Sequence, residues 1–75
     1  MIENNPTAKR FGEIISNARK AKSLTQQKLG EACGYTGRSA ELMVQAWEHD
    51  RKPIPIDRLR RLCAALDLPL DALIP

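Results

Sequence analysis

Aromatic side chains are scarce in this sequence of 75 residues: Phe11, Tyr35 and Trp47 are the only ones. Proteins that bind single-stranded nucleic acid without sequence preference stack successive bases on aromatic side chains along a groove. So few aromatics argue against a stacking surface of that kind. Trp47 lies on an apolar stripe, so we interpret it as a core residue and not as a wedge inserted between bases.

Cysteine and histidine, the usual ligands of a structural zinc ion, are also few. The chain has two cysteines, Cys33 and Cys63, and a single histidine, His49. These residues match no zinc-site spacing, and a structural zinc ion takes about four such ligands. We therefore expect no bound metal, with His49 at the surface or near phosphate. Because each cysteine falls within an apolar stripe, we expect buried free thiols, as in a protein of the reducing cytosol.

Long apolar runs and catalytic motifs are missing as well. No stretch approaches the roughly 20 apolar residues that span a bilayer, and the polar N-terminal segment is no signal peptide. The sequence contains no glycine-rich phosphate loop, no carboxylate pair with a pocket and no nucleophile paired with a histidine. These absences indicate a cytoplasmic protein that is not an enzyme, with no cofactor, no membrane segment and no evident small-molecule ligand.

The length of the chain allows one domain at most. A domain of this size buries only about 60% of the surface of its unfolded chain, so its core is small. The apolar fraction of 43% is nevertheless ordinary for a globular protein. We expect a flexible N-terminal segment over residues 1–6 and a folded domain over residues 7–75.

Apolar residues recur at helical spacing along nearly the whole chain, which predicts an all-α bundle of five helices. The third helix begins within Thr36–Ser39, while Thr25 caps the second helix and Gly34 ends it. The expected helices cover residues 7–21, 26–33, 36–49, 56–66 and 69–74. Their expected inward residues are Phe11, Ile14, Ile15, Ala18, Leu29, Ala32, Cys33, Ala40, Met43, Val44, Trp47, Leu59, Leu62, Cys63 and Leu66.

Basic residues are concentrated in two blocks, although the net charge is only +3. Residues 9–28 contain several lysines and arginines and one acid, Glu13, and residues 51–61 are similarly basic around Asp57. The C-terminal end is acidic. Such a distribution can present one attractive face to phosphate, and a solvated surface of mixed charge is an equal alternative.

The segment LTQQKLGEACG, residues 24–34, resembles the start of the helix-turn-helix in the lambda-repressor-like family, the Cro and phage-repressor type of DNA-binding domain. Other features follow in the family's order: Arg19 late in the first helix, Trp47-Glu48 at the end of the third, then a basic loop. The resemblance extends over residues 11–73. It implies a compact five-helix domain and a sequence-specific transcriptional regulator, of prokaryotic or phage-repressor type, that binds double-stranded DNA.

The resemblance also implies which residues contact DNA. The start of the second helix and the loop after the third bind phosphate, while the outward face of the third helix enters the major groove. The Thr25 cap adds a helix end that attracts anions. Arg38 and Gln45 suit guanine and adenine edges, and Leu42 suits a thymine methyl group. The expected DNA-binding residues are Gln26, Gln27, Lys28, Tyr35, Thr36, Arg38, Ser39, Leu42, Gln45, Arg51 and Lys52.

This sequence departs from the family pattern between Gly34 and Glu48. The segment is longer by about four residues, close to one helical turn of about 3.6, so the apolar stripe stays in phase. The extra turn either extends the third helix at its start, which projects Tyr35–Ser39 toward the DNA, or enlarges the preceding turn, which gives Leu42 and Gln45 the central role. The sequence does not decide between these two alternatives.

Contacts between the helices are implied as well. Gly30 stands where the family usually has a small residue, which indicates a close crossing of the second and third helices. Arg19 and Glu48 occupy the places of a buried ion pair between the first and third helices, and we predict that structural pair here. After it, Asp50 stands where the family often has glycine, and Asp tolerates left-handed geometry better than most residues.

Assembly and a rival function remain open. Family members commonly bind palindromic DNA as dimers with half-sites about 34 Å apart. A homodimer of this chain either forms only on DNA or uses Leu68, Leu70, Leu73 and Ile74, whose simpler role is to close the core. The rival is a protein-interaction module, antitoxin-like or a phage anti-regulator, that keeps the fold without binding DNA. The operator, the regulated gene and the direction of regulation are not specified.

Overall fold

In the computed structural model the backbone is described for residues 6–69 and the side chains for residues 11–69. This part of the chain forms four helices and no strands, which confirms the all-α fold. The expected fifth helix lies outside the described residues, as do Leu70, Leu73 and Ile74. The helices are α1 (Pro6–Ala21), α2 (Gln26–Ala32), α3 (Gly37–Glu48) and α4 (Ile56–Leu66).

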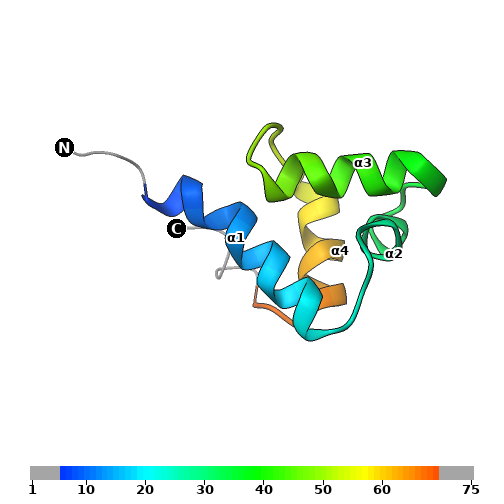
Figure 1. The fold of residues 1–75 in the computed structure, drawn as a ribbon, viewed down its shortest axis with the longest axis horizontal. Helices are drawn as coiled ribbons and strands as arrows, with labels where there is room; N and C mark the ends of the chain where they lie inside the picture. The colour runs from blue at the N-terminus through cyan, green and yellow to red at the C-terminus, as the bar shows by residue number, and fades with distance from the viewer. Residues whose placement is uncertain (1–5, 70–75) are drawn as a thin grey trace.

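The helices pack around one core to which all four contribute. α2 and α3 share the most extensive contact between any two of them. In Figure 1, α3 runs along one edge of the molecule, and α4 extends away from it between α1 and α2. The buried core cluster comprises Ile15, Leu29, Cys33, Val44, Trp47, Leu59, Leu62, Cys63 and Leu66.

Both ends of α2 are set by the residues expected there. The hydroxyl of Thr25 accepts a hydrogen bond from the amide of Lys28 at 3.0 Å, and such a cap is worth about 1 kcal/mol. At the other end Gly34 has a φ of 101°, and the Tyr35 amide donates to the carbonyl of Gly30 at 3.1 Å. Glycine suits this position because other residues meet a steric penalty at positive φ.

The length of α3 shows where the extra turn lies. α3 has 12 residues, and the connection from α2 is only Cys33–Thr36. The additional residues therefore extend the third helix and do not enlarge the turn. Thr36 is the N-cap residue, without a capping bond from its side chain. Beyond the other end of α3, Asp50 takes a left-handed conformation with a φ of 56°.

Ala32 was expected to face inward, and the structure shows that this prediction is wrong. Ala32 is exposed, whereas Leu29, Gly30 and Cys33 are buried. A Cβ atom on Gly30 would overlap the backbone carbonyl of Ala40 in α3, so the two helices approach closely there. The buried face of α2 is therefore turned toward Gly30, which leaves Ala32 on the opposite flank in solvent.

The two cysteines are free thiols buried in the core, as expected. Burial raises the pKa of Cys33 to about 11, although the positive charges of Arg58 and Arg61 oppose part of this change. Among the described side chains no three potential metal ligands come together. None of the helices within residues 6–69 combines the length and the apolar character needed to cross a membrane.

Candidate nucleic-acid interface

The end of α3 is held by hydrogen bonds centred on Glu48. The Nε of Arg19, in α1, donates to Oε2 of Glu48 at 2.6 Å, and Nη1 of Arg19 donates to the carbonyl of Leu24 at 2.8 Å. The two charged side chains are only 13% and 7% exposed. The structure thus contains the ion pair that the resemblance implies. Because Arg19 also bonds the Leu24 carbonyl, this nearly buried pair has the additional partners that such pairs need.

The same network engages Gln26 and Gln45. Nε2 of Gln26 donates to Oε1 of Glu48 at 3.0 Å, and Nε2 of Gln45 donates to Oε1 of Gln26 at 3.2 Å. Both glutamine side chains are half-buried. Their amides therefore join the start of α2 to α3, and neither side chain projects freely into solvent.

The side of α3 that faces away from the core carries Arg38, Ser39 and Leu42, all of them exposed. His49, also exposed, follows α3 as its C-cap residue. Leu42 is 47% exposed and is one of two large apolar side chains that the described residues leave open to solvent, the other being Ile56. The helical period places this outer face opposite the buried stripe of α3, so packing beneath the helix leaves the face free. The term outer face is used below for Arg38, Ser39 and Leu42.

The loop after α3 brings Lys52 to one flank of the outer face, and Arg51 precedes it in the same loop. Arg51 and Lys52 are both exposed, and the Arg51 amide donates to the carbonyl of Ala46 at 2.8 Å, which holds the loop against the end of the helix. The start of α2 borders the other flank, through the bond between its Gln26 and Gln45 of α3. A groove of about 240 Å³ on the loop flank is lined by Ser39, Leu42, Met43, Ala46 and Lys52.

The start of α2 presents two exposed side chains, Gln27 and Lys28. Gln27 is partly engaged, because its Nε2 donates to Oε2 of Glu31 at 3.1 Å. Lys28 forms no ion pair with any described side chain. Its ammonium group places a positive charge at the start of α2.

Tyr35 lies apart from the exposed candidates. Its ring is half-buried and meets Trp47 edge to face, with ring centroids 5.8 Å apart and an angle of 65° between the planes. The guanidinium of Arg58 lies over the Tyr35 ring at 4.8 Å and also donates to the carbonyl of Cys33 at 3.0 Å. Tyr35 therefore packs the turn before α3 against α4. Its neighbour Thr36 is exposed.

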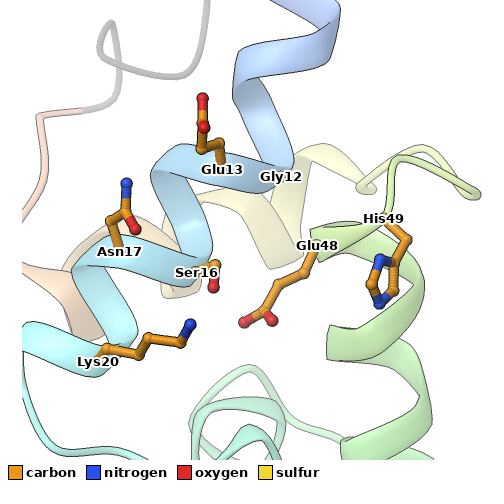
Figure 2. A pocket seen from close by; sticks show the side chains of 7 residues that line it. All are labelled: Gly12, Glu13, Ser16, Asn17, Lys20, Glu48 and His49. Atoms are coloured by element: carbon orange, nitrogen blue, oxygen red, sulfur yellow. The ribbon is translucent and has the colours of Figure 1, made fainter.

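Another cavity, of about 480 Å³, separates α1 from the end of α3. In Figure 2, Glu48 extends from α3 toward α1, where Ser16 and Lys20 point into the same space. Glu13 and His49 also line it. Because carboxylates and a lysine share this lining, the cavity offers no consistently positive surface for phosphate, and it lies outside the candidate interface.

Sequence reasoning missed a contact that fixes α3 against α1. The amide of Gly12 donates to Oδ1 of Asp50 at 3.2 Å, across 38 positions of the chain. A Cβ atom on Gly12 would overlap the carbonyl oxygen of Glu48. The signal was present, because Gly12 is a glycine inside a helix, the same feature that indicated the close crossing at Gly30.

The expected contact residues thus fall into two groups. Three are half-buried and bound to other parts of the chain: Gln26, Tyr35 and Gln45. The others are exposed: Gln27, Lys28, Thr36, Arg38, Ser39, Leu42, Arg51 and Lys52.

Comparison with known proteins gives one match. A family model described as helix-turn-helix, of the Cro and lambda-repressor-like type, matches residues 15–73, which include α2, α3 and the turn between them. No curated protein and no solved structure matches the chain.

Proposed function

Because this chain belongs to the lambda-repressor-like helix-turn-helix family of DNA-binding regulators, we propose that it recognises a specific sequence of double-stranded DNA with α3. The proposed role is that of a transcriptional regulator of prokaryotic or phage-repressor type. In this proposal α3 lies in the major groove, which is about 12 Å wide and admits an α-helix.

One observation carries the proposal: α3 is fixed from beneath while its outer face stays free. Trp47 and Val44 are buried in the core, and Glu48 is paired with Arg19. On the other side, Arg38 and Leu42 are exposed. A helix that is held rigidly and leaves polar and apolar groups uncovered can enter a groove at little cost in conformational freedom.

The residues divide into two proposed roles. Lys28 on one flank of the outer face, with Arg51 and Lys52 on the other, bind phosphates and so position the protein. Arg38 and Ser39, in the first turn of α3, contact base edges. Gln26 and Gln45 are hydrogen-bonded to each other and keep α2 and α3 in register. In this proposal Gln45 also lies close enough to the DNA major groove to contact a base.

Duplex binding at several salt concentrations tests this function. The protein should bind mixed-sequence duplex with log affinity falling linearly against log salt, by about 0.9 for each phosphate contact. A preferred sequence, selected from a random duplex library, should bind more tightly than the mixture at every salt concentration. Single strands of the same length are the control and should bind less tightly. Affinity that does not change with salt would contradict the proposal.

The competing function is that of a protein-interaction module with the same fold. The exposed apolar residues Leu42 and Ile56 are the observation in its favour. The cations beside Leu42 favour DNA, because an apolar protein interface is depleted of charge at its centre. For assembly, we propose dimer formation on DNA, since Leu68 is already half-buried and packs against the core of its own chain.

A further inference from the structure

The groove beside α3 has a mainly apolar floor and is bordered by the cation of Lys52. It has a volume of about 240 Å³. Four of its lining residues lie on α3 at the spacing i, i+3, i+4, i+7, which places them on one side of the helix. Lys52 completes the lining from the loop. The residues on α3 are Ser39, Leu42, Met43 and Ala46.

We propose that this groove receives the C5-methyl group of a pyrimidine in the DNA major groove. The inference rests on the proposed function, and it names the base that the site requires: thymine, or 5-methylcytosine, at one defined position. The thymine methyl is the apolar group that an unmodified base pair displays in the major groove. Leu42, at 47% exposure, is the side chain positioned to cover it.

The charges around the groove favour DNA over a protein or a second copy of the chain. Among the described residues that line the groove, Lys52 is the only charged one and none is a carboxylate. The acid nearest in sequence on α3, Glu41, lies on the other side of the helix by the helical period. A cation next to an apolar floor matches a strand of DNA, in which the phosphate of each nucleotide accompanies its base.

Replacing thymine by uracil gives a test at the level of one methyl group, because uracil differs from thymine only by its absence. A preferred site is first selected from a random duplex library, and each of its thymines is then replaced in turn by uracil. One replacement should weaken binding by about fourfold, the value expected for burial of one methyl group. At the same position cytosine should bind weakly, and 5-methylcytosine should recover about fourfold relative to cytosine.

Matched variants show whether the groove is responsible. Leu42→Ala should bind the thymine and uracil sites with equal affinity, because the side chain that covers the methyl is gone. Ile56→Ala is the control, since Ile56 is also exposed, at 58%, but does not line the groove. The Ile56→Ala protein should still bind the thymine site about fourfold more tightly than the uracil site. Both substitutions are at exposed positions, and far-UV circular dichroism checks that each variant folds.

Three outcomes would overturn the inference, and they are distinguishable. If a preferred site is selected but no uracil replacement weakens binding, the groove does not hold a methyl group while the proposed function stands. If no duplex is bound at all, the proposed function fails and the inference fails with it. If Leu42→Ala abolishes self-association of the protein and leaves the difference between thymine and uracil intact, the groove is a contact between copies of this chain.

Discussion

The Nε atom of Arg19 lies 2.6 Å from Oε2 of Glu48, so a residue near the end of α1 supports the last turn of α3. The bond from the Gly12 amide to Asp50 adds a second attachment just beyond that turn. Together these contacts set the orientation of α3 relative to the rest of the domain. Substitutions at these contacts should therefore lower the stability of the fold. They should weaken DNA recognition indirectly, because they loosen the position of α3.

Substitution of Arg19 by alanine should destabilise the protein by about 3 kcal/mol, because it leaves the nearly buried carboxylate of Glu48 without its counter-charge. Urea unfolding followed by the fluorescence of Trp47, the only tryptophan, measures the change. A double-mutant cycle with Glu48→Gln should reveal a clear coupling energy between the two positions. Additive effects of the two substitutions would show that the Arg19–Glu48 ion pair does not stabilise the fold.

The exposed pair between Lys22 and Asp67 provides a matched control for the buried one. Its side chains are 40% and 72% exposed, so water screens the attraction between them. Lys22→Ala should cost less than about 1 kcal/mol. A loss as large as that of Arg19→Ala would mean that burial is not the source of the difference.

Replacement of Gly30 by alanine should destabilise the protein by about 1–3 kcal/mol, since the added methyl group overlaps the backbone of Ala40. Replacement of glycine by alanine inside a helix normally raises stability, by about 1 kcal/mol, so the effect expected here has the opposite sign. Ala64→Gly, at an exposed position of α4, is the control and should lose stability in the usual direction. Thermal unfolding of both variants tests the prediction, and a stabilised Gly30→Ala protein would contradict it.

Arg38→Ala and Lys52→Ala should weaken DNA binding in different ways. Loss of Arg38 should relax the sequence preference at one position, by about 1–3 kcal/mol, because it removes a base contact. Gln45→Ala should also relax the preference, since it loosens the link to α2 as well. Loss of Lys52 should weaken all sequences alike and reduce the salt slope by about 1. Binding to a panel of single-base variants separates these effects, and uniform weakening in all three proteins would show that the assigned base contacts are wrong.

The stability of the protein should fall between pH 9 and pH 11 through Cys33. Burial raises the pKa of this thiol in the folded state from 9.0 to about 11. As the pH rises above 9, the thiol loses its proton in the unfolded chain before it does so in the folded protein. This ionisation lowers the free energy of the unfolded state relative to the folded state, so the free energy of unfolding falls. Urea midpoints at pH 8, 9, 10 and 11 measure the decline. Cys33→Ala should show a shallower decline over the same range, and an identical slope in both proteins would rule out this cause.

Much of the fold follows from interactions between residues close together in the chain. Thr25 caps the helix three residues before Lys28, and Gly34 ends it through bonds within α2. The same holds for the apolar stripe of α3, which repeats at the helical period. Features of this kind are readable from sequence because every group that matters lies within about two turns of helix.

What the sequence by itself determined is the four helices within residues 6–69, most of their buried positions and the family to which the chain belongs. Only the tertiary structure decided which polar groups are free. Gln45 reaches Gln26 across 19 positions and Gly12 reaches Asp50 across 38, so no local pattern shows that these groups are engaged. Packing at Gly30 likewise turned Ala32 outward. The physical reason is that hydrogen bonding and burial depend on neighbours in space, which the chain brings together only when the helices pack.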